Sequence, residues 1–138
     1  MAGVRLVPEL ICADFARSLA FYTELLGFAV RYARPEERFA YLEREGAELM
    51  IEQSVGRAFL AAPLEQPYGR GVNFQIEVGD VVALYARVGE AGCALYLPLE
   101  EKWYRRGDDE VGNRQFIVPD PDGYLLRFFQ DLGMRSRG

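Results

Sequence analysis

The 138-residue sequence predicts an α+β protein made of two successive βαβββ modules. The second half of the chain repeats the landmarks of the first half in the same order. In each half, a short strand-like stretch ends in aspartate and is followed by a run at helical spacing. Half of the residues are hydrophobic and 27% are charged, which is typical of a globular chain. We therefore expect one domain, 1–138, with module one over about 4–55, a linker over 56–70 and module two over about 71–132.

Each module is predicted to begin with a strand and a helix that meet at an aspartate. Asp14 and Asp80 hold this position, and aspartate is a favourable N-cap because its carboxylate accepts backbone N–H bonds. The helical patterns end at Gly27 in module one and at Gly89 or Gly92 in module two, as glycine favours helix ends. The apolar residues at helical spacing are Phe15, Leu19, Tyr22 and Leu26 in module one and Val81, Leu84, Tyr85 and Val88 in module two.

The later strands share a second landmark, an aromatic residue seven positions before a turn glycine. Phe39 precedes Gly46 in module one, and Phe116 precedes Gly123 in module two. The equal spacing predicts that Phe39 and Phe116 occupy equivalent places in the two sheets. The strands that close the modules are expected over 47–53 and 124–130.

Module two differs from module one by a polar insertion, roughly 99–111. The aspartate and the aromatic residue are 36 positions apart in module two but 25 apart in module one. We expect the run Glu100-Glu101-Lys102 within this insertion to be a solvated loop. Asp120-Pro121-Asp122-Gly123 is a turn signature, since proline presets φ and glycine allows a positive one, and we assign it no chemistry.

Strand alternation divides the side chains between two faces of each sheet. The helix should cover apolar positions such as Leu10, Ile51, Ile76 and Phe128. The opposite face then mixes apolar, aromatic and charged residues, as a ligand-binding concavity does, unless the other module or a dimer partner covers it. Its predicted members are Val7, Glu9, Ile11, Phe39, Tyr41, Glu48, Met50 and Glu52 in module one and Asn73, Gln75, Glu77, Phe116, Val118, Leu125, Arg127 and Phe129 in module two.

Composition excludes several classes of function. The net charge of −5 has the wrong sign for nucleic acid or an anionic membrane as a partner. No apolar stretch is long enough to span a bilayer and no leader is apparent, so we expect a cytoplasmic protein. The chain has no histidine, which excludes Ser-His and Cys-His nucleophile pairs. Cys12 and Cys93 have no paired spacing that would indicate a disulfide framework or a zinc site.

Two segments resemble the signatures of the vicinal oxygen chelate superfamily, which includes glyoxalase I, extradiol dioxygenases, fosfomycin resistance enzymes and bleomycin resistance proteins. They are Ser18-Leu19-Ala20-Phe21-Tyr22-Thr23-Glu24-Leu25-Leu26-Gly27-Phe28 and Phe116-Ile117-Val118-Pro119-Asp120-Pro121-Asp122-Gly123-Tyr124. The resemblance extends over about residues 4–132. It implies two βαβββ modules whose mixed sheets curl into a cup that is completed in a homodimer.

The resemblance also identifies where enzymes of this superfamily hold a divalent metal. By spacing, the four ligand positions fall on Val7, Met50, Asn73 and Arg127, and none of these residues is a histidine or a glutamate. A permanent cation at Arg127 would repel a dication in a site of low dielectric constant. We therefore expect no metal and no other cofactor.

The branch of the superfamily without a metal is the bleomycin resistance type, which sequesters its drug. Gly112-Asn113-Arg114-Gln115-Phe116 resembles the final strand pair of this branch, and Phe39 falls where the branch has an aromatic that stacks on the drug. The branch commonly has a tryptophan where this chain has Gly112, and Trp103 lies nine residues earlier.

The sequence therefore favours a metal-free binding protein that sequesters a planar, cationic aromatic compound such as an antibiotic, and it disfavours an enzyme. Arg127 is expected to contact a carboxylate of the binding face or an anionic group of the ligand. The alternative is a lyase, isomerase or dioxygenase related to glyoxalase, with a rearranged metal site or carboxylate acid–base chemistry. The expected ligand-binding residues are Glu9, Phe39, Tyr41, Met50, Glu52, Asn73, Gln75, Trp103, Phe116 and Arg127.

Overall fold

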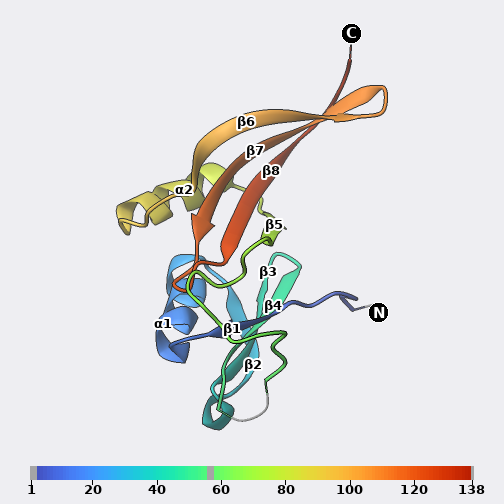
Figure 1. Ribbon diagram of the computed structural model, residues 1–138. Helices are drawn as coiled ribbons and strands as arrows, with labels where there is room; N and C mark the ends of the chain where they lie inside the picture. Colours follow the sequence, from blue (N-terminus) through green and yellow to red (C-terminus); the bar gives the residue numbers. More distant parts are fainter. Residues whose placement is uncertain (1–2, 56–57, 138) are drawn as a thin grey trace. The chain divides into compact units, whose positions relative to one another are not determined.

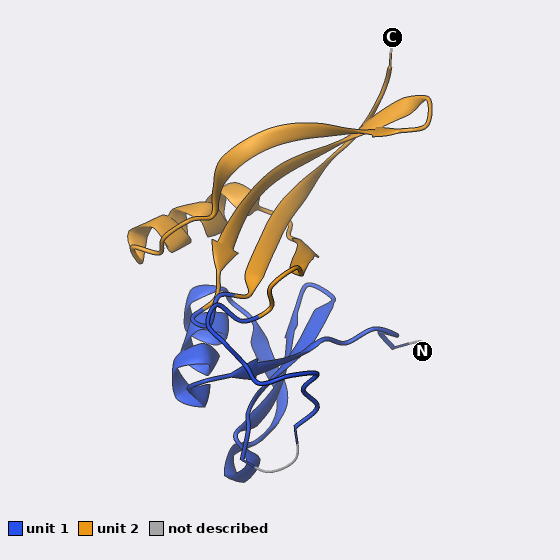
Figure 2. Cartoon of the chain, viewed as in Figure 1, with its two compact units in different colours: residues 1–68, 121–123 blue, residues 69–120, 124–138 orange. Residues whose placement is uncertain are grey.

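The computed structural model describes residues 3–55 and 58–137 and contains two compact units (Figures 1 and 2). Unit 1 consists of Met1–Tyr68 and Pro121–Gly123, and unit 2 consists of Gly69–Asp120 and Tyr124–Gly138. Each unit holds one four-stranded mixed sheet and its helix in the order βαβββ, which confirms the predicted α+β fold class. Residues 56–57, the first two of the predicted linker, lie outside the described residues. No helix in the described chain is long and apolar enough to cross a membrane.

Unit 1 contains a sheet with the strand order β1-β4-β3-β2, in which β1 and β4 are parallel and the other pairs are antiparallel. The predicted N-cap is confirmed, because Asp14 Oδ1 accepts a hydrogen bond from the backbone N–H of Arg17 at 3.1 Å. The strands are β1 (Glu9–Cys12), β2 (Ala29–Arg34), β3 (Phe39–Arg44) and β4 (Ala47–Gln53), and the helices are α1 (Phe15–Ala20), its π-helical continuation η1 (Phe21–Leu25) and the short 3-10 helix η2 (Pro35–Glu37).

Unit 2 repeats this arrangement with the strand order β5-β8-β7-β6. Asp80 Oδ1 accepts from the backbone N–H of Ala83 at 3.0 Å, so the second predicted N-cap is also confirmed. The strands are β5 (Asn73–Glu77), β6 (Leu97–Arg106), β7 (Asp109–Pro119) and β8 (Leu125–Ser136), and the helix is α2 (Val81–Glu90).

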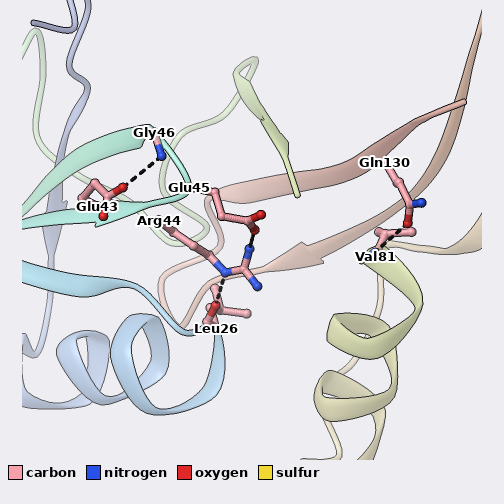
Figure 3. A network of polar contacts seen from close by, with 7 residues as sticks. All are labelled: Leu26, Glu43, Arg44, Glu45, Gly46, Val81 and Gln130. Carbon is pink, nitrogen blue, oxygen red and sulfur yellow. Dashed lines mark hydrogen bonds and ion pairs between the residues drawn. The ribbon is translucent and has the colours of Figure 1, made fainter. Parts of the chain in front are cut away.

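A glutamine in the closing strand of each unit ties that strand to the start of the helix. Gln53 Oε1 accepts from the N–H of Phe15 at 2.9 Å. Gln130 Oε1 accepts from the N–H of Val81 at 3.1 Å, the contact drawn in Figure 3. Both contacts satisfy a backbone donor that the first turn of a helix leaves without an intrahelical partner. The internal repeat therefore extends to side-chain contacts that spacing alone did not reveal.

The core of each unit lies between its helix and the facing side of its sheet. Burial of these apolar residues supplies most of the stabilisation of each unit, at about 1.5–3 kcal/mol for a fully buried large side chain. In unit 1 the buried residues include Tyr22, Leu26, Leu42 and Ile51, and in unit 2 they include Val81, Leu84, Val88, Leu126 and Phe128.

Phe116 and Val118 lie on the helix side of the unit 2 sheet, so the expectation that they face away from the helix is wrong. Phe116 is fully buried, pairs with Phe128 in the β7–β8 ladder, and its ring lies 5.2 Å from the ring of Tyr85 in α2. The cause is the length of the turn. Two residues connect β3 to β4, but five residues, 120–124, connect β7 to β8. The extra residues shift the alternation of β7 by one position relative to β3.

The β3–β4 turn and the β7–β8 turn are fixed by different contacts. In the first of these turns the N–H of Gly46 donates to Glu43 Oε1 at 2.9 Å (Figure 3). Gly46 has φ +90°. The signature ending in Gly123 is a turn, as predicted, and it holds a carboxylate that is only 1% exposed. This carboxylate, on Asp122, accepts from Ala13 N at 3.2 Å and from Gln66 Nε2 at 2.9 Å, both within unit 1. Asp122 therefore has a structural role in its unit.

The polar insertion of module two is a strand extension, which corrects the expectation of a solvated loop. Residues 100–102 lie within β6, and β6 pairs with β7 as far as Arg106 and Asp109, where a turn through Gly107 joins the strands. Long polar side chains stabilise this hairpin across the strands, as in the Arg114–Glu101 ion pair at 3.5 Å. For the same reason β8 continues past residue 130 to Ser136.

Trp103 faces the helix side of this sheet, on the same face as Glu101, Arg114 and Phe116. Its indole lies against Gly112, since a Cβ at residue 112 would be 2.7 Å from Trp103 Cη2. The guanidinium of Arg135 also lies against the indole, with its Cζ 4.0 Å from the centroid of the Trp103 ring. The indole therefore fills the space that a side chain at position 112 would need.

This contact predicts that Gly112→Ala destabilises the protein by about 1–3 kcal/mol through overpacking. Urea denaturation measures this free energy. Combining Gly112→Ala with Trp103→Ala should cost less than the sum of the single variants, because removing the indole makes room for the methyl group. Strict additivity of the two substitutions would show that the indole does not lie over Gly112.

Candidate functional site

The face of the unit 1 sheet that points away from α1 is formed by two rows of residues across the four strands. The row between them, which contains Leu10, Ala40 and Ile51, is buried in the core. We call the two outward rows the unit 1 face. One row consists of Glu9, Met50, Tyr41 and Tyr32, and the other consists of Ile11, Glu52, Phe39 and Arg34. The pairing confirms that the five candidates predicted in module one share a face, and their role in binding stays a prediction.

Three aromatic rings form a stack on the unit 1 face. The rings of Tyr32 and Tyr41 are 5.0 Å apart at an angle of 19°, and the rings of Tyr32 and Phe39 are 6.0 Å apart at 34°. Tyr32 is 50% exposed, whereas Phe39 is only 3% exposed. Tyr32 therefore offers the accessible ring of the stack, with geometry suited to a flat aromatic ligand.

Sequence reasoning missed Tyr32. Its strand, β2, pairs antiparallel with β3, but the register shifts between Val30 and Tyr32. Such a bulge moves one residue out of simple alternation, so the face of Tyr32 does not follow from the sequence. One feature of the sequence does point to Tyr32. It lies a few residues before Phe39 and Tyr41, and a short connection between two antiparallel strands places such a residue beside them.

Two arginines lie over the stack. Arg34 Cζ is 4.0 Å from the Phe39 ring centroid, and Arg31 Cζ is 5.8 Å from that of Tyr41. Arg31 also pairs with Glu48 at 2.9 Å, and the Tyr41 hydroxyl donates to the same carboxylate at 2.5 Å. The hydrogen bond to Glu48 raises the pKa of Tyr41, because the phenolate form could not donate it. Tyr41 is thus held in one orientation as a neutral donor.

Glu52 has a carboxylate whose charge is poorly compensated. Burial raises the pKa of Glu52, repulsion from Glu9 and Glu37 raises it further, and Arg34 opposes this shift. Among residues 3–55 and 58–137, no side chain forms a hydrogen bond or an ion pair with Glu52. Glu52 is the cross-strand neighbour of Phe39. A negative charge with free acceptor oxygens therefore lies next to the aromatic stack.

The outward face of the unit 2 sheet carries three further candidates, Asn73, Gln75 and Arg127. Arg127 Nε donates to Gln115 Oε1 at 3.2 Å, and its guanidinium lies 5.5 Å from the Tyr104 ring. Within the described part of the chain Arg127 has no ion pair, so the expected contact with a carboxylate is not formed there. An amide takes the place of the expected carboxylate.

Gln115 and Tyr104 are the residues of this second face that sequence reasoning missed. Gln115 Nε2 donates to Glu100 Oε2 at 2.8 Å and to the Tyr104 hydroxyl at 2.7 Å. Gln115 therefore connects Arg127 to Glu100 without direct contact between the charges. The same one-residue shift that buried Phe116 brought Gln115 to the outward face.

Trp103 and Phe116 do not share a face with the other candidates of unit 2. Both side chains lie on the helix side of the unit 2 sheet, opposite to Gln75 and Arg127. Trp103 Nε1 donates to Glu101 Oε2 at 3.1 Å, so the indole is engaged by its own strand as well as by Arg135. The side chain of Trp103 therefore does not belong to the outward face of the unit 2 sheet.

The residues at the four metal-ligand positions of the superfamily do not fit a divalent ion. Val7 offers no donor, Met50 offers a soft thioether, Asn73 offers an amide and Arg127 offers a cation. In the described chain, no cluster of three or more aspartate, glutamate, cysteine or histidine side chains could hold a metal ion. We therefore derive no chemistry through a metal at these positions.

Comparisons with known proteins agree with this fold. The family profile described as Glyoxalase/Bleomycin resistance protein/Dioxygenase superfamily matches residues 5–128. A protein named bleomycin resistance protein from Geobacillus stearothermophilus is 26% identical over 135 residues, which cover 91% of this chain and 96% of the relative.

Two solved structures are also similar to this chain. TioX from Micromonospora sp. ML1 is 26% identical with a TM-score of 0.69 and covers 94% of this chain and 100% of its own. A superfamily member from Vibrio splendidus 12B01 is 45% identical, covers 93% of this chain and 98% of its own, and has a TM-score of 0.43. Because the family profile matches residues 5–128, the chain belongs to the glyoxalase/bleomycin resistance protein/dioxygenase superfamily.

Proposed function

We propose that this protein is a metal-free binding protein of the bleomycin resistance type, which captures a planar, cationic aromatic compound on the unit 1 face. The observation that carries this proposal is the stack of Tyr32 and Tyr41, 5.0 Å apart, beside the poorly compensated carboxylate of Glu52. A flat ring can stack on the exposed tyrosine while a positive charge approaches the carboxylate. Capture is stoichiometric and leaves the compound unchanged.

The energies of these contacts favour a ligand that is both flat and positively charged. Stacking adds about 0.5–1.5 kcal/mol beyond burial of the ring. A cation over an aromatic ring adds about 0.5–2 kcal/mol, and more where water is excluded. Neither contribution alone gives tight binding. Glu9 and Glu52 repel an anionic ligand, so charge sets the class of ligand and stacking adds affinity.

The curated relatives support the same class of function, since they bear the name bleomycin resistance protein. The donor set at the four metal-ligand positions also favours binding over metal-dependent chemistry. A drug-like compound that acts inside the cell would be captured in the cytoplasm, which we propose as the location of this protein.

The first test compares three flat tricyclic compounds by titration calorimetry. Proflavine is a cation, acridine is neutral in weakly alkaline buffer, and anthracene-9-carboxylate is an anion. We expect proflavine to bind most tightly and Tyr32→Ala to weaken it at least about tenfold, because the accessible ring is lost. Tyr96→Ala is the matched control, since Tyr96 is an exposed tyrosine of unit 2.

Two results would contradict the proposal. Preferential binding of the anion would direct attention to Arg127. Conversion of a bound compound, detected by mass spectrometry after incubation, would favour the alternative of a glyoxalase- or dioxygenase-related enzyme.

A second prediction concerns Glu52→Gln. Because the folded state raises the pKa of Glu52, the stability that its protonated form contributes is present at low pH and is lost as pH rises through the folded-state pKa. Relative to wild type, Glu52→Gln should therefore become more stable as pH is raised from about 4 to about 7. The same variant should lower the affinity for proflavine at neutral pH. Denaturant titrations at several pH values measure the effect on stability. If the Glu52 carboxylate had a purely structural role, Glu52→Gln would instead be less stable than wild type at neutral pH.

We also propose that the protein forms a homodimer. Within the described residues each sheet is open and ends in two strands that pair with another strand on one side only, and association covers such edges. Sedimentation equilibrium should give about twice the chain mass of 15.6 kDa. A monomer that persists as concentration is raised would rule out the dimer without affecting the ligand proposal, because every residue of the unit 1 face comes from one unit.

A further inference from the structure

We infer that the unit 1 face recognises a planar guanidinium or amidinium group, and that Arg34 occupies the place of this group in the free protein. The inference rests on the proposed function and specifies the chemical class of its ligand. A protein site that holds one of its own side chains reveals which chemical group fits there. Here the occupant is itself flat and cationic.

The contact between Arg34 and Phe39 is the first evidence. The guanidinium carbon is 4.0 Å from the ring centroid, close enough for the two flat groups to be in contact. Phe39 points away from the core side of its sheet, yet it is only 3% exposed. Arg34 and Tyr32 both lie against its ring on this face. Removal of the guanidinium would therefore uncover an aromatic surface.

The second evidence is the neighbouring charge. Glu52 attracts Arg34, and each affects the ionisation of the other, but no hydrogen bond joins them. Both oxygens of Glu52 remain available to a ligand. Two parallel N–H groups of an amidinium or guanidinium match the two oxygens of a carboxylate, which makes such pairs strong and specific.

Arg34 is also easy to displace. It lies at the end of β2, its side chain is half-exposed, and its charged partner is the half-exposed Glu37 three residues along the chain. Exposed ion pairs of this kind contribute little to stability, about 0–1 kcal/mol. Glu37 can still accompany Arg34 when the guanidinium leaves Phe39. A ligand therefore competes with a weakly held side chain.

This arrangement favours a delocalised planar cation over a primary ammonium. A guanidinium or amidinium lies flat on a ring and keeps its N–H groups in the plane for a carboxylate, whereas an ammonium is a compact and strongly hydrated charge. Aryl amidines and aryl guanidines combine this group with a ring that can extend over Tyr32.

Benzamidine tests the inference directly, with benzamide as the neutral analogue and benzylamine as the ammonium analogue. Arg34→Ala should increase the affinity for benzamidine at least tenfold in titration calorimetry, because the competing guanidinium is gone. The same variant should increase the affinity for benzylamine less than that for benzamidine, and it should leave the affinity for benzamide unchanged. Thermal unfolding of the variant verifies that it folds.

Arg17→Ala is the control, because it removes one positive charge from unit 1 at helix α1, on the other side of the sheet, and leaves Arg34 over Phe39. We expect it to change benzamidine affinity by no more than about twofold. An equal gain in both variants would show a general charge effect, and an unchanged or weaker affinity in Arg34→Ala would overturn the inference. If wild-type protein binds proflavine while Arg34→Ala has no effect on benzamidine, only this inference fails. If proflavine does not bind either, the proposed function fails as well.

Discussion

The poorly compensated carboxylate of Glu52 is the constraint on which our interpretation of unit 1 depends. Burial next to Phe39 removes water from this group, and Glu9 repels it, yet no described donor binds it. Such a group costs stability in the free protein, and a cation that binds there would recover part of that cost. The aromatic stack beside it determines which cations bind with the highest affinity. Charge and shape thus select the same kind of ligand, a flat cation.

The two units share one fold but differ in the chemistry of their outward faces. In unit 1 the stacked tyrosines leave an exposed ring and an unpaired carboxylate. In unit 2 the charge of Arg127 is held by the amide of Gln115, which in turn binds Glu100 and Tyr104. In unit 2 the arginine is thus engaged by a neutral amide and by the Tyr104 ring, whereas in unit 1 no described donor binds Glu52. Duplication of a fold therefore does not duplicate a site, since the site depends on side chains that the repeat does not preserve.

The sequence predicted those features that depend on local chemistry. Asp14 and Asp80 cap helices as expected, and strict alternation placed Glu9 and Glu52 on the correct face. Features that depend on a count of residues between strands were not predictable. A turn three residues longer moved Phe116 into the core, and strand extension put Trp103 on the helix side. A one-residue change in register exchanges the two faces of a strand, and neither turn length nor a bulge is encoded in the landmarks of the repeat.

The most direct test of the central claim is to observe which residues respond to a bound flat cation. Proflavine added to isotopically labelled protein should shift the NMR signals of the ring of Tyr32 and the side-chain carboxyl carbon of Glu52. Signals of Arg127 and Gln115 should stay unchanged. Shifts confined to the Arg127 network, with Tyr32 and Glu52 unaffected, would contradict the assignment of the binding site to unit 1.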